Sequence, residues 1–161
     1  MIRDARNEDF VRIAAITNHY IETTSIHFAH EPVSVDQLTA TWAQGRERYP
    51  WVVADEAGQV IGYAKAGVWR DRAAYQWTTE IGLYVDAAHH RRGLGRALYT
   101  ELLDRLAARG FRSAIAGITL PNDPSIAMHE AFGFVSVGTV REAGYKHGAW
   151  HDVAFFQKRL S

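Results

Sequence analysis

A short run of glycines and arginines has the composition of an anion-binding loop. Gly93 and Gly95 stand where a strand-like stretch gives way to a helix-like one, and three arginines surround them: Arg91, Arg92 and Arg96. The first turn of a helix has unpaired backbone N–H groups and a positive dipole end, so it attracts anions. Glycines let this backbone approach a phosphate closely, and arginines add charge-assisted hydrogen bonds. The run predicts a phosphate-binding loop; a helix that merely begins with basic surface residues is the simpler alternative.

Two common nucleotide motifs do not fit this loop. A P-loop needs a Gly-Lys-Ser/Thr run after its glycines, and none follows Gly95. A dinucleotide fingerprint needs a third glycine where this chain has Leu98. The remaining interpretation is a loop for a pyrophosphate that is not part of a nucleoside triphosphate.

Glu80 is the best candidate for acid–base chemistry. It lies in an otherwise apolar stretch, residues 77–85, directly before the loop. Burial there would raise the pKa of its carboxyl group toward neutrality, which suits a base that takes a proton from an amine. A solvent-facing strand glutamate is the alternative.

The eight histidines do not form a metal-binding pattern. His89 and His90 are adjacent and so point apart, and the other close pairs fall on expected loops. Without cysteine, the chain has neither a thiolate zinc site nor a cysteine nucleophile. We expect no metal.

Length and composition indicate one folded domain spanning residues 1–161. The chain is 47% hydrophobic, and its 18 basic residues balance its 18 acidic ones. Charge balance argues against nucleic-acid and membrane surfaces, and the sequence has no run of about 18 apolar residues. The N-terminus lacks the apolar core of a secretory signal, so we expect a cytoplasmic protein.

Periodicity and turn signals place helices and strands along the chain. Helices are expected after caps at Asn7 and Ser34, after Gly95, and after Asn122. Strands are expected at residues 1–5, 51–55, 60–69, 75–85, 113–118, 134–140 and 153–157, with a loop at residues 141–152 joining the last two. Early alternation and late hairpin-like pairing predict an α/β fold with a mixed sheet.

The segment His90-Arg91-Arg92-Gly93-Leu94-Gly95 resembles the pyrophosphate loop of the GNAT N-acetyltransferases, whose pattern is Gln/Arg-x-x-Gly-x-Gly/Ala. His90 departs from the first position, but the family contacts phosphate mostly through loop backbone N–H groups. The resemblance implies a mixed, mostly antiparallel sheet of about seven strands flanked by about four helices. It also implies an acetyl-CoA-dependent enzyme.

The same resemblance assigns roles to residues outside the loop. It implies that acetyl-CoA contacts Leu83, Tyr84, Val85, the loop from His90 to Arg96, and the pair Asn122 and Ser125. It makes Glu80 the general base, acting directly or through water. Where the family usually has a tyrosine acid this chain has His129, which is either an acid or a structural residue.

Several longer motifs resemble a subgroup, the phosphinothricin and methionine sulfoximine or sulfone N-acetyltransferases. They are Tyr49-Pro50-Trp51, Trp69-Arg70-x-Arg72-x-Ala74-Tyr75, residues 120–125 and residues 144–153. The subgroup implies transfer to the α-amino group of a small amino acid with an oxygen-rich head. It also implies a homodimer. The expected substrate contacts are Phe28, Arg70, Arg72, Tyr145 and Lys146.

Two other functions stay open. The acceptor could be a protein N-terminus or lysine, which would need an open peptide groove. A non-catalytic acyl-CoA sensor would bind CoA without turnover and would not need Glu80.

Overall fold

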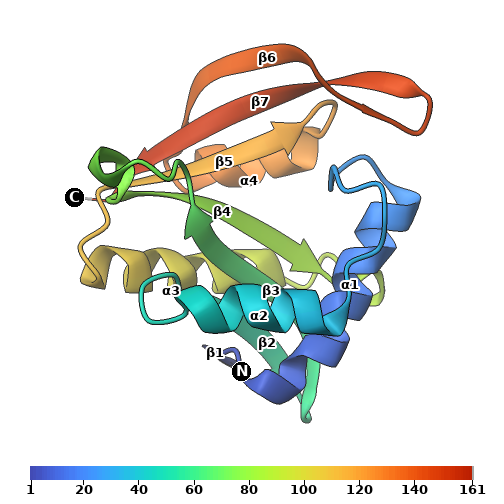
Figure 1. The fold of residues 1–161 in the computed structure, drawn as a ribbon, viewed down its shortest axis with the longest axis vertical. Coiled ribbons are helices and arrows are strands. Elements are labelled where there is room, and N and C mark those ends of the chain that lie inside the picture. Colours follow the sequence, from blue (N-terminus) through green and yellow to red (C-terminus); the bar gives the residue numbers. More distant parts are fainter. Residues whose placement is uncertain (161) are drawn as a thin grey trace.

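A single seven-stranded sheet, in the order β1-β2-β3-β4-β5-β7-β6, runs through the protein. The computed structural model describes residues 1–160 and is shown in Figure 1. The strands are β1 (Ile2–Asp4), β2 (Trp51–Glu56), β3 (Gln59–Val68), β4 (Thr78–Val85), β5 (Ser113–Thr119), β6 (Val135–Lys146) and β7 (Ala149–Arg159). The helices are α1 (Phe10–Thr23), α2 (Val35–Gly45), α3 (Leu94–Ala108) and α4 (Asp123–Ala131). The predicted α/β fold with a mixed, mostly antiparallel sheet is confirmed.

The parallel pairing of β4 with β5 is short. It covers Thr78 to Glu80 against Ser113 to Ile115, whereas β4 continues to Val85 and β5 to Thr119. The two strands therefore separate after Glu80, and the sheet opens at this point (Figure 1). Within residues 1–160, the last part of β4 is paired only with β3.

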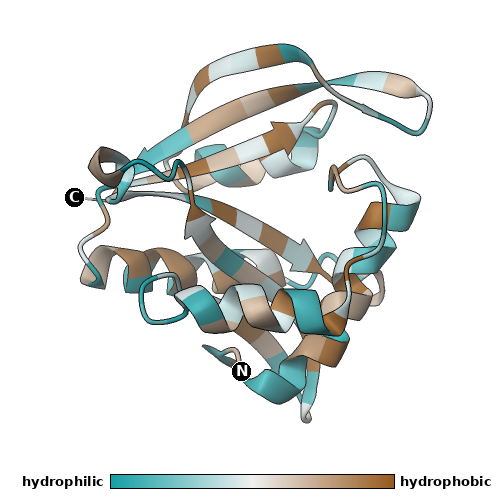
Figure 2. Cartoon of the chain, in the orientation of Figure 1, coloured by the Kyte–Doolittle hydropathy of each residue, from teal (hydrophilic) through white to brown (hydrophobic). Residues whose placement is uncertain are grey.

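The helices cover the sheet in two layers, each with its own core. On one face α1 and α2 pack on β2 and β3 around Phe10, Trp42 and Tyr63. On the other face α3 packs against the sheet through Leu98 and Leu102. Figure 2 shows the corresponding brown, apolar stretches along the central strands and the helices. None of the helices within residues 1–160 is both long and apolar enough to cross a membrane.

The two predicted helix caps had different outcomes. Ser34 caps α2 with the expected capping box, in which its hydroxyl accepts from the Gln37 N–H. Asn7 is not a cap: it begins a 3₁₀ turn, Asn7–Asp9, and Asp9 instead accepts from the Arg6 N–H at 2.7 Å. The same carboxylate pairs with Arg3, which fixes the start of α1 to β1.

The loop predicted at residues 141–152 is wrong. These residues extend β6 and β7 into a long hairpin that turns at His147 and Gly148 and projects from the sheet (Figure 1). Two register shifts, between Ser136 and Gly138 and between Val140 and Gly144, interrupt the pairing. Nearly all of β6 is exposed, so the hairpin lacks the alternation of buried and exposed residues that identifies a strand in sequence.

A smaller difference concerns β4, which begins at Thr78 rather than at Tyr75. Ala73–Tyr75 form a 3₁₀ turn instead.

Candidate active site

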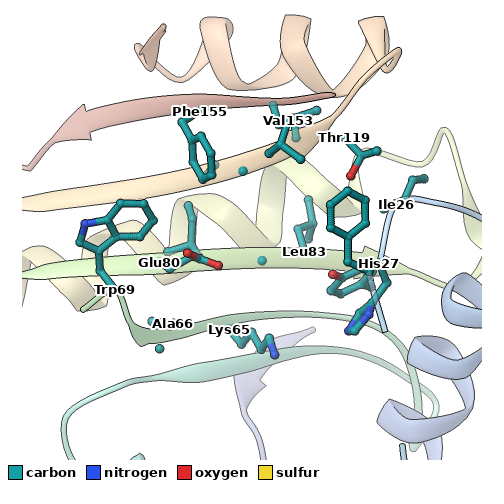
Figure 3. A pocket seen from close by; sticks show the side chains of 18 of the residues that line it. Ile26, His27, Lys65, Ala66, Trp69, Glu80, Leu83, Thr119, Val153 and Phe155 are labelled. Carbon is teal, nitrogen blue, oxygen red and sulfur yellow. The ribbon is translucent and has the colours of Figure 1, made fainter. Parts of the chain in front are cut away.

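A cavity of about 1000 Å³ lies where β4 and β5 separate. Figure 3 shows Glu80 and Leu83 of β4 in this cavity, with Thr119 of β5 and Phe155 of β7 on another side. Of the residues predicted for the site, the cavity is lined by Phe28, Arg70, Glu80, Leu83, Tyr84, Asn122, Ser125 and His129.

Glu80 is the last β4 residue paired with β5. Its side chain faces the cavity and stays in contact with solvent. Burial nevertheless raises the pKa of its carboxyl group, while the nearby cations Lys65 and Arg70 partly offset this effect. A carboxylate of raised pKa at the edge of a cavity is suited to general-base chemistry.

Two further charged or titratable residues, Lys65 and His27, line the cavity. Lys65 projects from β3, and His27 from the segment after α1 lies beside it (Figure 3). Burial, Lys65 and Lys146 together lower the pKa of His27 to about 4, so its ring is neutral at pH 7. The His27 Nδ1 accepts a hydrogen bond from the Ala29 N–H at 3.0 Å.

Aromatic side chains enclose the other parts of the cavity. Trp69 packs edge-on against Phe155 with 5.8 Å between ring centroids, and the Arg70 guanidinium lies 4.6 Å from the Trp69 ring. Phe28 packs over Gly144 so closely that a Cβ at this position would overlap its ring. The lack of a side chain at Gly144, in the β6–β7 hairpin, thus leaves room for the Phe28 ring.

The phosphate loop has the backbone geometry that its sequence requires. Arg91 and Gly93 have positive φ angles of 63° and 74°, and Gly93 is the residue that precedes α3. Gly95 lies in the first turn of α3, where an added Cβ would stand 3.2 Å from Leu83 and 3.3 Å from Met128. Its small size lets the start of α3 approach β4 and α4 closely.

The side chains of the loop have different partners. The Arg92 guanidinium forms an ion pair with Glu56 at 2.5 Å. His90 Nε2 lies 2.8 Å from the Tyr20 hydroxyl and 3.1 Å from the Val85 carbonyl oxygen, so His90 fixes the loop to the end of β4. Arg96 lies over the Phe132 ring, with 5.9 Å between its guanidinium carbon and the ring centroid.

Asn122 and Ser125 are at the start of α4. The Asn122 side-chain oxygen accepts from the Ser125 N–H at 3.3 Å and so caps the helix. His129, one turn further on, is buried, and its Nδ1 lies 2.7 Å from the Ser125 carbonyl oxygen. Its Nε2 lies 3.0 Å from the Tyr99 hydroxyl, which comes from α3. Both ring nitrogens of His129 thus have protein partners.

Other predicted site residues lie outside the cavity lining. Arg72 is an exposed turn residue, and Val85 lies at the end of β4. Tyr145 packs on Trp150 across the hairpin with 5.2 Å between ring centroids. Lys146 is buried, and its ammonium donates to the carbonyl oxygens of Ile21 and His27, both at 2.6 Å.

Lys65, His27, Trp69 and Tyr99 line the cavity but were not predicted for the site. Lys65 lies on β3, the strand next to Glu80, and Trp69 directly follows this strand. The one charged residue in the otherwise apolar run 60–69 was the available signal. Tyr99 meets His129 only through the packing of α3 on α4, which has no local signal. Within residues 1–160, no group of three or more histidine, aspartate or glutamate side chains could hold a metal ion.

The family model described as the acetyltransferase (GNAT) family matches residues 13–134. The chain belongs to the GNAT acetyltransferase family. A phosphinothricin N-acetyltransferase of Streptomyces viridochromogenes is 48% identical over 98% of this GNAT chain and 86% of the relative. An L-methionine sulfoximine/L-methionine sulfone acetyltransferase of Salmonella typhimurium is 35% identical over 99% of this chain and 94% of the relative. The predicted family and subgroup are confirmed.

Solved GNAT structures match the whole chain. A phosphinothricin acetyltransferase from Sinorhizobium meliloti, in complex with acetyl-CoA, has a TM-score of 0.96 at 37% identity and covers 100% of this chain and 88% of its own. A ribosomal-protein-alanine N-acetyltransferase from Brucella melitensis has a TM-score of 0.94 at 34% identity, over 99% of each chain. The fold is thus shared by relatives whose names give different acceptors.

Proposed function

We propose that this GNAT enzyme transfers the acetyl group of acetyl-CoA to the α-amino group of a small amino acid with an oxygen-rich head. Phosphinothricin and methionine sulfoximine or sulfone are such amino acids. The observation that carries the proposal is the position of Glu80, a carboxylate of raised pKa between cations in the cavity where β4 and β5 separate. The names of the relatives support the choice of acceptor.

The residues around the opened sheet fit the acetyl donor. Gly95 lets the first turn of α3 approach β4, and the loop from His90 to Arg96 presents backbone N–H groups and cations for a pyrophosphate. The unpaired side of β4 beyond Glu80 offers backbone groups to an extended amide-containing arm, and Asn122 and Ser125 lie across the cavity. The bound donor supplies an activated thioester carbonyl.

The acceptor amine must lose a proton before it attacks that carbonyl. We assign this proton to Glu80, whose raised pKa makes it a better base than an ordinary carboxylate. We assign Arg70, which lies over the Trp69 ring, to an oxygen of the acceptor head, and Phe28, which also lines the cavity, to its stem. With no cysteine in the chain, we propose direct attack of the amine.

Thiol release from acetyl-CoA tests this function. We would measure it with phosphinothricin, methionine sulfoximine, methionine sulfone and methionine. The enzyme should act on at least one of the first three, and Glu80→Gln should lower kcat/KM by about 100- to 10,000-fold. A wild-type enzyme that binds CoA but acetylates none of these three oxygen-rich amino acids would disprove the proposal.

A protein acceptor is the second candidate, favoured by the likeness to the Brucella melitensis enzyme. A peptide with an N-terminal alanine belongs in the same assay. Faster turnover of this peptide than of all four amino acids would select the second candidate.

We also propose that the protein is a homodimer that acts in the cytoplasm, the compartment that supplies acetyl-CoA. β6 is an edge strand with exposed apolar side chains: Val135, Val137 and Val140, with Tyr145 and Trp150 near the hairpin tip. Figure 2 shows brown residues along β6. An exposed apolar edge strand favours pairing with a second chain.

A further inference from the structure

The cavity contains a lysine, Lys65, whose ammonium contacts an aromatic ring but no hydrogen-bond acceptor among residues 1–160. Lys65 is largely enclosed, and within residues 1–160 its ammonium makes neither a hydrogen bond nor an ion pair. It lies over the indole of Trp51, with Nζ 5.0 Å from the ring centroid. Burial lowers the pKa of Lys65, and the Glu80 carboxylate opposes this shift.

The position of Lys65 follows from the register of β3 and β4. Lys65 is paired with Gly82 and Gly67 with Glu80, so these four residues lie on one face of the sheet. The charged residues occupy one diagonal and the glycines the other. A Cβ at Gly67 would have nothing within 4 Å, and the stem of Lys65 runs over Gly82, whose added Cβ would lie 3.7 Å from Lys65 Cε. The two glycines therefore place no side chain between the Lys65 ammonium and the Glu80 carboxylate.

Lys146 shows how this protein provides hydrogen-bond acceptors for the ammonium of a structural lysine. Its buried ammonium donates to two backbone carbonyl oxygens at 2.6 Å. Among the described residues Lys65 has no such acceptors, although an ammonium has three donors to satisfy and a buried unpaired charge is costly. A ligand bound in the cavity would supply the acceptors that the Lys65 ammonium lacks.

We propose that Lys65 binds an oxyanion of the acceptor amino acid and so determines acceptor specificity. This inference rests on the proposed function. When the amine of an amino acid faces Glu80, its α-carboxylate also comes close to the Glu80 carboxylate and is repelled by it. The Lys65 ammonium, diagonal to Glu80, offsets this repulsion. Arg70 then remains for the other end of the acceptor, on the Trp69 side of Glu80 (Figure 3).

An acceptor can present the oxyanion in two ways. It is either the α-carboxylate, which every amino acid has, or an anionic head such as the phosphinate of phosphinothricin. Three acceptors separate these sources: phosphinothricin has both anions, methionine sulfone has only the α-carboxylate, and methionine sulfone amide has neither.

The test compares kcat/KM for the three acceptors in the wild type and in Lys65→Met. Loss of about 10- to 100-fold with phosphinothricin and sulfone, but not with the amide, would show that Lys65 binds the α-carboxylate. Loss with phosphinothricin alone would show that it binds the phosphinate. Equal loss with all three acceptors, or no loss, would overturn the inference, because a residue that only supports the fold or Glu80 cannot distinguish them.

Two control variants make the result specific. Lys65→Arg keeps the charge and should recover part of the discrimination between acid and amide. Arg46→Met removes a cation stacked on another tryptophan, Trp42, 5.0 Å from its ring centroid and outside the cavity lining, and should not change the ratios. A wild type that acetylates neither these acceptors nor methionine sulfoximine would refute the proposed function, and the inference with it. An active wild type with unchanged ratios in Lys65→Met would refute the inference alone.

Discussion

The Tyr99 hydroxyl and His129 Nε2 lie 3.0 Å apart in a buried contact between α3 and α4. On the other side of the ring, His129 Nδ1 faces the Ser125 carbonyl oxygen, which can only accept. Nδ1 therefore carries the proton, and Nε2 accepts from Tyr99. Burial lowers the pKa of His129, which agrees with a neutral ring. This geometry favours a positioning role for His129 over that of a proton donor.

Tyr99→Phe should destabilise the protein, because it leaves His129 Nε2 buried without a donor. We expect a loss of about 1–3 kcal/mol in the free energy of unfolding, measured by urea denaturation. Tyr75→Phe, which alters an exposed phenol, is the control and should have little effect. Equal stability of the two variants would contradict the hydrogen bond.

The pH profile of kcat/KM should report Glu80. The base must be ionised, so activity falls as pH drops through its pKa, and burial places this limb above the ordinary glutamate value. Lys65 lowers the pKa of Glu80, so Lys65→Met should move the acidic limb to higher pH. A limb that stays in place would mean that another group controls it.

Glu80→Gln should stabilise the fold at neutral pH. A folded-state pKa raised above the unfolded value means that the ionised carboxylate is disfavoured in the folded protein. This cost is present above the folded pKa and disappears below the unfolded one. Urea denaturation should thus show a more stable variant at pH 7 and a vanishing difference toward pH 4; a less stable variant at pH 7 would show that Glu80 supports the fold.

Gly144→Ala should impair acceptor binding. The added methyl group overlaps the Phe28 ring and must displace it from the cavity wall. We expect a higher KM for the amino acid and a smaller change for acetyl-CoA, measured by steady-state kinetics. Phe28→Leu relieves the overlap, so the effects of the two changes should be less than additive in the double variant. Additive effects would mean that Phe28 does not transmit the change.

Val137→Glu should disrupt the proposed dimer, because it places a charge on the exposed edge strand β6, where Val137 is 54% exposed. Light scattering after size exclusion should show a dimer for the wild type and a monomer for the variant. Val11→Glu on α1, where Val11 is 65% exposed, is the matched control and should remain dimeric. A monomeric wild type would refute the dimer.

Local signals in the sequence were enough for most of the sheet and for the phosphate loop. The Ser34 capping box and Gly93 give helix boundaries through short-range chemistry, so they could be recognised without a fold. The hairpin of β6 and β7 could not, because an exposed strand interrupted by register shifts has no buried face to produce a pattern.

The site was harder to predict than the fold, for the same reason. Glu80 stood out because a charge in an apolar strand is unusual. Lys146 was expected near the substrate from its motif, but only the tertiary structure shows that its ammonium is occupied by Ile21 and His27. That Lys65 lies on the same face of the sheet as Glu80 follows only from the pairing of β3 with β4, in which Lys65 is opposite Gly82.

The separation of β4 from β5 has a consequence for how such an enzyme can change. Under the proposed function, the donor meets the unpaired backbone of β4 and the phosphate loop together with side chains of that loop and of α4, whereas the acceptor meets side chains on β3, β4 and the loop after α1. Substitutions at the acceptor end can therefore alter what is acetylated while the donor contacts remain. The same fold can thus change its acceptor through single positions such as residue 65, while the part that binds the acetyl donor stays the same.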